Sequence, residues 1–113
     1  MVTAQDAFDY MGKIFKKDQA LKLKQKVVVQ YNVLGPGGGS WQLVLETGEY
    51  KITPGDSIKN VSCTLSFDSV ETFVGFTKGE IPPLKVYTEG KARFSGSQKL
   101  IMEVGKIFPV VKI

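Results

Sequence analysis

Residues 60–79 read NVSCTLSFDSVETFVGFTKG, and the spacing of the apolar residues changes halfway through this stretch. In the first half, apolar and polar side chains alternate up to Phe67, which predicts a strand with one buried face. Asp68 followed by Glu71 is an N-cap pattern, so a helix is expected over 68–78. A run of strands followed by a region that contains helices favours an α+β domain.

The chain before this stretch predicts one helix and three further strands. Thr3 and Asp6 form a variant of the capping box, and the helix that they open is expected to reach Lys17. The strands are expected at 26–34, 40–47 and 49–53. The first of them is almost continuously apolar, as in the middle of a sheet. With 60–67 these strands predict an antiparallel meander that is apolar on one face.

The glycine-rich segment 35–39 lies between two of these expected strands. A phosphate-binding loop needs a helix directly after its glycines, whereas a strand follows here. A hairpin connection is therefore favoured.

The chain after Gly79 predicts a break, a short strand and a last helix. Ile81-Pro82-Pro83-Leu84 is expected to be neither helix nor central strand, because proline removes a backbone donor. A strand is expected at 91–95. Ser97 is then expected to cap a helix that Pro109 ends. The apolar stripe of that helix is Leu100, Ile101, Val104, Ile107 and Phe108.

Length and composition limit the classes of function. The 113 residues fit a single domain, 1–113, and its first residues lack the pattern of a signal peptide, which favours the cytoplasm. The sequence has no histidine and one cysteine, Cys63, on the apolar face of its expected strand. Histidine is the commonest general base and metal ligand, so we expect neither catalysis nor a metal site.

Six lysines lie between Lys13 and Lys26, and the net charge of the chain is +4. Such a run forms a solvated surface or contacts an anionic partner, either nucleic acid or acidic lipid headgroups. Single-stranded nucleic acid is bound by aromatic side chains interleaved with basic ones, and the run from Lys16 to Lys26 contains no aromatic residue. Nucleic-acid binding is therefore not expected.

The second half of the sequence is unusually rich in large apolar side chains. Phe73 and Phe76 lie on different faces of the helix expected over 68–78, and Ile81 and Leu84 flank the two prolines. A well-packed core accounts for such a surplus. The alternative is an interior that is incompletely filled and that accepts an apolar ligand.

The order and spacing of the motifs resemble the sterol carrier protein 2 (nonspecific lipid-transfer) family. The motifs that carry the resemblance are Asp68-Ser69, Thr77-Lys78-Gly79-Glu80-Ile81-Pro82-Pro83, Glu89-Gly90-Lys91 through Gly96-Ser97, Trp41, Gly48 and Pro54-Gly55-Asp56. Ser97 stands where the family usually has aspartate, and serine caps a helix about as well. The chain ends Val111-Lys112-Ile113 rather than in a peroxisomal Ser-Lys-Leu address, which again favours the cytoplasm.

The resemblance implies a five-stranded, mostly antiparallel sheet covered on one face by helices, with an apolar tunnel between them. It implies binding of fatty acid, fatty acyl-CoA, phospholipid or sterol with low selectivity. We expect a carrier that is a monomer and has no cofactor. Transient contact of the lysines with an anionic membrane surface is also expected. The expected lining is Trp41, Phe73, Phe76, Ile81, Leu84, Phe94, Ile101, Met102 and Phe108.

One alternative is a docking or dimerisation module that serves a lipid-metabolising enzyme. Its apolar patch would lie around Phe76 and Val110.

Overall fold

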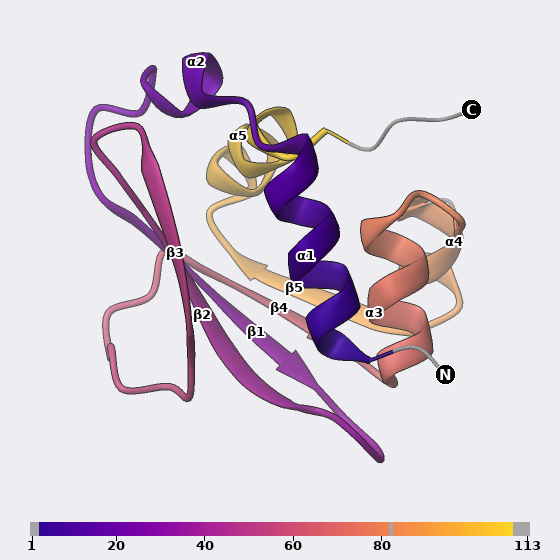
Figure 1. The fold of residues 1–113 in the computed structure, drawn as a ribbon. Coiled ribbons are helices and arrows are strands. Elements are labelled where there is room, and N and C mark those ends of the chain that lie inside the picture. Colours follow the sequence, from indigo (N-terminus) through magenta and orange to yellow (C-terminus); the bar gives the residue numbers. More distant parts are fainter. Residues whose placement is uncertain (1–2, 82, 110–113) are drawn as a thin grey trace.

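A computed structural model describes residues 3–81 and 83–109, apart from the side chains of Pro83, Leu84 and Tyr87 (Figure 1). The helices are α1 (Ala4–Ile14), α2 (Lys17–Ala20), α3 (Val70–Thr77), α4 (Pro83–Thr88) and α5 (Gln98–Ile107). The strands are β1 (Val27–Val33), β2 (Gly39–Glu46), β3 (Glu49–Pro54), β4 (Cys63–Phe67) and β5 (Ala92–Gly96). Helices α1, α3, α4 and α5 lie on one side of the sheet, which confirms the predicted α+β class.

Helix α1 begins as expected and ends earlier than expected. The backbone N–H of Asp6 donates to the Thr3 hydroxyl at 3.3 Å and that of Thr3 donates to the Asp6 carboxylate at 2.8 Å, so the capping box is confirmed. The expected extension to Lys17 is wrong, because Phe15 leaves the helix and packs between Tyr50 and Phe108, with ring centroids 4.6 and 5.4 Å away. Lys17 instead begins α2.

The sheet has the strand order β3-β2-β1-β4-β5. Strand β1 is central, as its sequence predicts. The expected four-strand meander is wrong at β4, which pairs with β1 in parallel after the chain crosses from the β3 edge. Alternation of apolar and polar residues shows which face of a strand is apolar. It does not show which strand lies beside it, so the pattern did not predict the crossover.

The crossover segment between β3 and β4 covers the sheet face opposite the helices. The Gln42 side chain is 1% exposed on that face. Its amide donates to the Gln30 side-chain oxygen and to the backbone oxygen of Ile58, both at 2.8 Å, and it accepts from the backbone N–H of Ile58 at 3.1 Å. These hydrogen bonds fix the crossover to the sheet.

The Gln42→Leu variant should lower the free energy of unfolding by roughly 2–4 kcal/mol, because the buried side-chain oxygen of Gln30 and both partly buried backbone groups of Ile58 lose a hydrogen-bond partner. Urea unfolding measures this loss. Gln5→Leu is the matched control at an exposed position and should change stability by less than about 0.5 kcal/mol. Equal effects of the two variants would contradict the network.

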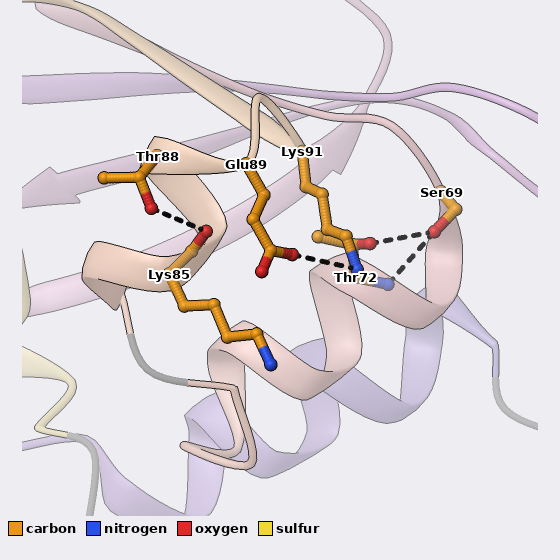
Figure 2. Close-up of polar contacts among 6 residues, drawn as sticks. All are labelled: Ser69, Thr72, Lys85, Thr88, Glu89 and Lys91. Atoms are coloured by element: carbon orange, nitrogen blue, oxygen red, sulfur yellow. Dashed lines mark hydrogen bonds and ion pairs between the residues drawn. The ribbon is translucent and has the colours of Figure 1, made fainter.

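The segment from α3 to α4 differs from expectation at two positions. The N-cap of α3 is Ser69 rather than Asp68, since the Ser69 hydroxyl accepts the backbone N–H of Thr72 at 3.1 Å (Figure 2). Helix α4 begins at Pro83, although this residue was expected to lie outside any helix. Proline is tolerated in the first turn of a helix, where its missing N–H would have no partner.

The predicted last helix is confirmed, because the Ser97 hydroxyl accepts the backbone N–H of Leu100 at 3.2 Å and α5 follows. Phe73 lies at the centre of the core and is fully buried, with the rings of Phe67, Phe8 and Tyr31 at 5.1, 5.2 and 5.6 Å. No helix in the described part of the chain is long and apolar enough to span a membrane.

Candidate functional site

An apolar pocket of about 200 Å³ lies between the helical layer and the sheet. Helices α1, α3 and α5 form its walls, and strands β1 and β4 form its floor. We call it the α5 pocket. Its lining residues are Met11, Ile14, Tyr31, Leu65, Phe76, Thr77, Ile101, Val104, Gly105 and Phe108.

The α5 pocket has a buried floor and an open mouth. Tyr31 and Leu65 form the floor and are 4% and 6% exposed, and Met11 on the α1 wall is 3% exposed. Ile101 is half-buried, and Gly105 is exposed at the rim. A Cβ atom at Gly105 would meet no heavy atom within 4 Å, so the space beside this part of α5 is empty. Among the described residues, those that line the pocket carry no charge, so the pocket has the chemistry of a site for an apolar group.

The volume limits what the pocket holds without rearrangement. Apolar cavities of about 150 Å³ admit a benzene-sized molecule, whereas sites for drug-sized ligands begin at roughly 300 Å³. At about 200 Å³ the α5 pocket has room for part of an acyl chain. A whole chain requires a wall to move outward. Helix α5 is the candidate, since Gly105 already leaves its side of the mouth open.

The structure brings three of the expected lining residues together in the α5 pocket. They are Phe76 from α3, Ile101 from α5 and Phe108, which directly follows α5. Phe94 packs against Phe76, and the centroids of the two rings are 5.7 Å apart.

The other expected lining residues lie elsewhere. Phe73 is enclosed by the core. Trp41 lies in a separate groove of about 430 Å³ between α1 and the β2–β3 edge. Ile81 packs against Gly75, where a Cβ atom would approach it to 2.7 Å. Met102 is 67% exposed. The Leu84 side chain lies outside the described residues, as does Val110.

Sequence reasoning missed most of the floor and the rim. Tyr31 and Leu65 belong to the strands expected at 26–34 and 60–67, and the pattern of those strands does not distinguish a packed position from one beside a void. Gly105 carried a usable signal. A glycine inside a helix costs about 1 kcal/mol relative to alanine, which suggests a packing or functional reason for its presence.

Two buried groups of the sheet resist ionisation. Burial raises the pKa of the Tyr31 phenol, and proximity to Cys63 raises it further. Burial also raises the pKa of the Cys63 thiol. Cys63 is thus a buried apolar residue, as its place in the strand predicts. Among the described residues no three carboxylates or thiols gather into a metal-binding group.

Stability should fall as the pH rises from about 9 to about 11, because both groups release their protons at lower pH in the unfolded chain than in the folded one. The unfolded state then binds fewer protons, so the free energy of unfolding decreases with pH. Urea unfolding at a series of pH values measures the slope. Tyr31→Phe should flatten the curve above about pH 10, and an unchanged slope would contradict the assignment.

The chain is an α+β domain. It has a five-stranded mixed sheet, helices on one face of that sheet and an apolar pocket between the two layers. The model of the SCP-2 sterol transfer family matches residues 11–109, and the chain is a member of that family. Membership implies binding and transfer of a lipid or sterol, and domains of this family are in general non-catalytic. A comparison with curated proteins finds no match.

Solved structures share the fold at low sequence identity. The sterol carrier protein domain of Helicoverpa armigera has a TM-score of 0.67 and 19% identity, with 96% of this chain and 93% of that chain covered. Palmitated SCP2L2 of Aedes aegypti gives 0.65 and 15%, with 96% of each chain covered. The sec-alkylsulfatase Pisa1 from Pseudomonas sp. gives 0.70 and 15% over 94% of this chain, which spans only 16% of the enzyme chain.

Proposed function

We propose that this domain is a non-catalytic carrier that holds the apolar part of a fatty acid, fatty acyl-CoA, phospholipid or sterol in the α5 pocket. The observation that carries the proposal is a pocket with an apolar lining, a buried floor and a mouth left open at Gly105. A relative with the same fold has been solved in a palmitated form, which supports an acyl chain as the cargo.

The chemistry of the lining supports low selectivity. Burial of apolar surface is non-directional and contributes about 0.8 kcal/mol per methylene group. A long chain therefore compensates for the entropic cost of association without a specific polar contact. Phe76 and Ile101, both half-buried at the mouth, have room to adjust to ligands of different width.

We propose a cytoplasmic monomer that needs no cofactor. The docking alternative has less support, because Phe76 packs against Phe67 and Phe94 with ring centroids at 5.4 and 5.7 Å instead of standing out from the surface.

Native mass spectrometry of the purified chain tests the carrier proposal. The expected result is a monomer with co-purified fatty acid, which delipidation removes and added palmitate restores. A ligand-free dimer that takes up no palmitate would contradict the proposal and favour the docking alternative.

A further inference from the structure

Two residues of the α5 pocket carry a polar side-chain group, although the pocket is otherwise apolar. Among the described residues that line it, Tyr31 and Thr77 are the ones with a side-chain oxygen or nitrogen atom. Thr77 is half-buried on the α3 wall. Tyr31 is 4% exposed and lies on the floor, in the middle of the central strand β1. The floor of the pocket therefore contains a hydroxyl group.

The Tyr31 hydroxyl has no hydrogen-bond partner within the described part of the chain. Among the described residues, every side-chain oxygen or nitrogen atom that the protein covers completely does have such a partner. The Tyr31 hydroxyl is therefore not covered completely, and the space open to it is the α5 pocket that its side chain lines. A hydroxyl without a partner is unfavourable in an apolar place, so this group favours a ligand that supplies one.

Neighbouring aromatic rings hold the Tyr31 side chain in place. The rings of Phe73 and Phe8 pack against it, with centroids at 5.6 and 6.0 Å. Its backbone is fixed as well, because β1 pairs with β2 through Trp41 and with β4 through Leu65 at this position. The hydroxyl is therefore oriented before a ligand arrives, which lowers the entropic cost of a hydrogen bond to it.

The Tyr31 phenol is uncharged near neutral pH. Burial raises its pKa, and proximity to Cys63 raises it further. A neutral phenol both donates and accepts hydrogen bonds, so it matches the hydroxyl group of an alcohol, which does the same. An ionised carboxylate does not suit this floor, because no described residue of the lining supplies a cation to balance its charge in an apolar place.

We propose that Tyr31 determines which end of a lipid reaches the floor of the α5 pocket: a long-chain alcohol enters with its hydroxyl group first and hydrogen-bonds to Tyr31, whereas an ionised fatty acid enters with its methyl end first. The proposal rests on the carrier function above and adds a specificity-determining residue to the same pocket. The apolar part of either ligand is still bound without directional contacts. The alcohol gives the Tyr31 hydroxyl a partner, and the methyl end of a fatty acid does not.

Affinities for hexadecanol and palmitate, two probes with chains of equal length, test this selection. Each is measured by displacement of a fluorescent fatty acid from the delipidated chain. Tyr31→Phe should bind hexadecanol about fivefold more weakly, because one neutral hydrogen bond is lost. The same variant should bind palmitate unchanged or up to about threefold more tightly, because the methyl end no longer faces a hydroxyl without a partner.

Two matched variants control for the loss of a hydroxyl as such. Thr77→Val removes the other hydroxyl of the lining, and Tyr10→Phe removes a phenol hydroxyl outside the pocket. Each should change the affinity for either probe less than about twofold. The proposal would be overturned if Tyr31→Phe kept its affinity for hexadecanol or lost affinity for both probes alike. It would also be overturned if Thr77→Val weakened hexadecanol binding as much as Tyr31→Phe does.

Urea unfolding at neutral pH tests the state of the Tyr31 hydroxyl without any ligand. Tyr31→Phe should be at least as stable as the parent chain, because the substitution removes a polar atom that has no partner in the protein. A less stable variant would mean that the hydroxyl already has a partner, which would contradict the proposal.

Nuclear Overhauser contacts with the Tyr31 ring show the orientation of the ligand directly. In the parent chain, we expect contacts to the ring from the hydroxyl-bearing methylene group of hexadecanol and from the terminal methyl group of palmitate. Contacts from the terminal methyl group of both ligands would overturn this inference and leave the carrier function intact. A parent chain that binds neither probe would overturn the carrier function, and this inference with it.

Discussion

Replacing Gly105 by leucine should weaken the binding of palmitate about 50-fold without unfolding the protein. The new side chain enters the empty space beside α5 and excludes roughly three methylene groups of the ligand, each worth about 0.8 kcal/mol. The same change should raise the free energy of unfolding by up to about 1 kcal/mol, because leucine favours a helix more than glycine does. Fluorescence titration and urea unfolding measure the two effects.

Gly105→Ala is the matched control. It should give a similar gain in stability, and it fills too little of the pocket to change the affinity for palmitate more than about threefold. If the leucine variant bound palmitate as tightly as the alanine variant, the acyl chain would not lie beside α5.

Replacing Phe73 by alanine should lower the free energy of unfolding by about 3–5 kcal/mol, because the ring is fully buried among three other aromatic rings. This is a large share of the stability of a small domain. The variant tests whether Phe73 belongs to the core or, as the sequence suggested, to the lining of the ligand site. Urea unfolding measures the loss.

Phe76→Ala is the comparison that separates the two roles. Phe76 is half-buried at the α5 pocket, so its loss should cost less stability than that of Phe73 and should weaken palmitate binding more. Palmitate binding is compared under conditions in which both variants are folded. The reverse order of the two binding effects would place the ligand on the Phe73 side of α3.

Local signals in the sequence were sufficient for most of the elements. Thr3 with Asp6 and Ser97 with the following apolar stripe located the starts of α1 and α5, because a helix start depends on neighbouring residues. The parallel pairing of β1 with β4 depends on where the chain goes after β3. No local pattern contains that information, and α4 was missed because Pro83 lies at a position where proline is tolerated.

The candidate site could be predicted only in part, because here too the sequence carries local signals only. Ile101 and Phe108, which line the α5 pocket, were expected in the lining because they belong to a helical apolar stripe, and Phe76 was expected there because it lies on a second face of its helix. The pocket itself is empty volume, and the amino-acid pattern at Tyr31 or Leu65 is the same whether the neighbouring space is filled or not. Met102 is exposed, and its place in the sequence does not reveal this, because an exposed apolar side chain resembles a buried one in sequence.

The most direct test of the central claim is the set of nuclear Overhauser contacts between ¹³C-labelled palmitate and the protein. We expect contacts from the ligand methylenes to the side chains of Met11, Ile101 and Val104, which surround the α5 pocket. Contacts confined to Trp41 and Tyr50, in the groove on the other side of α1, would contradict it.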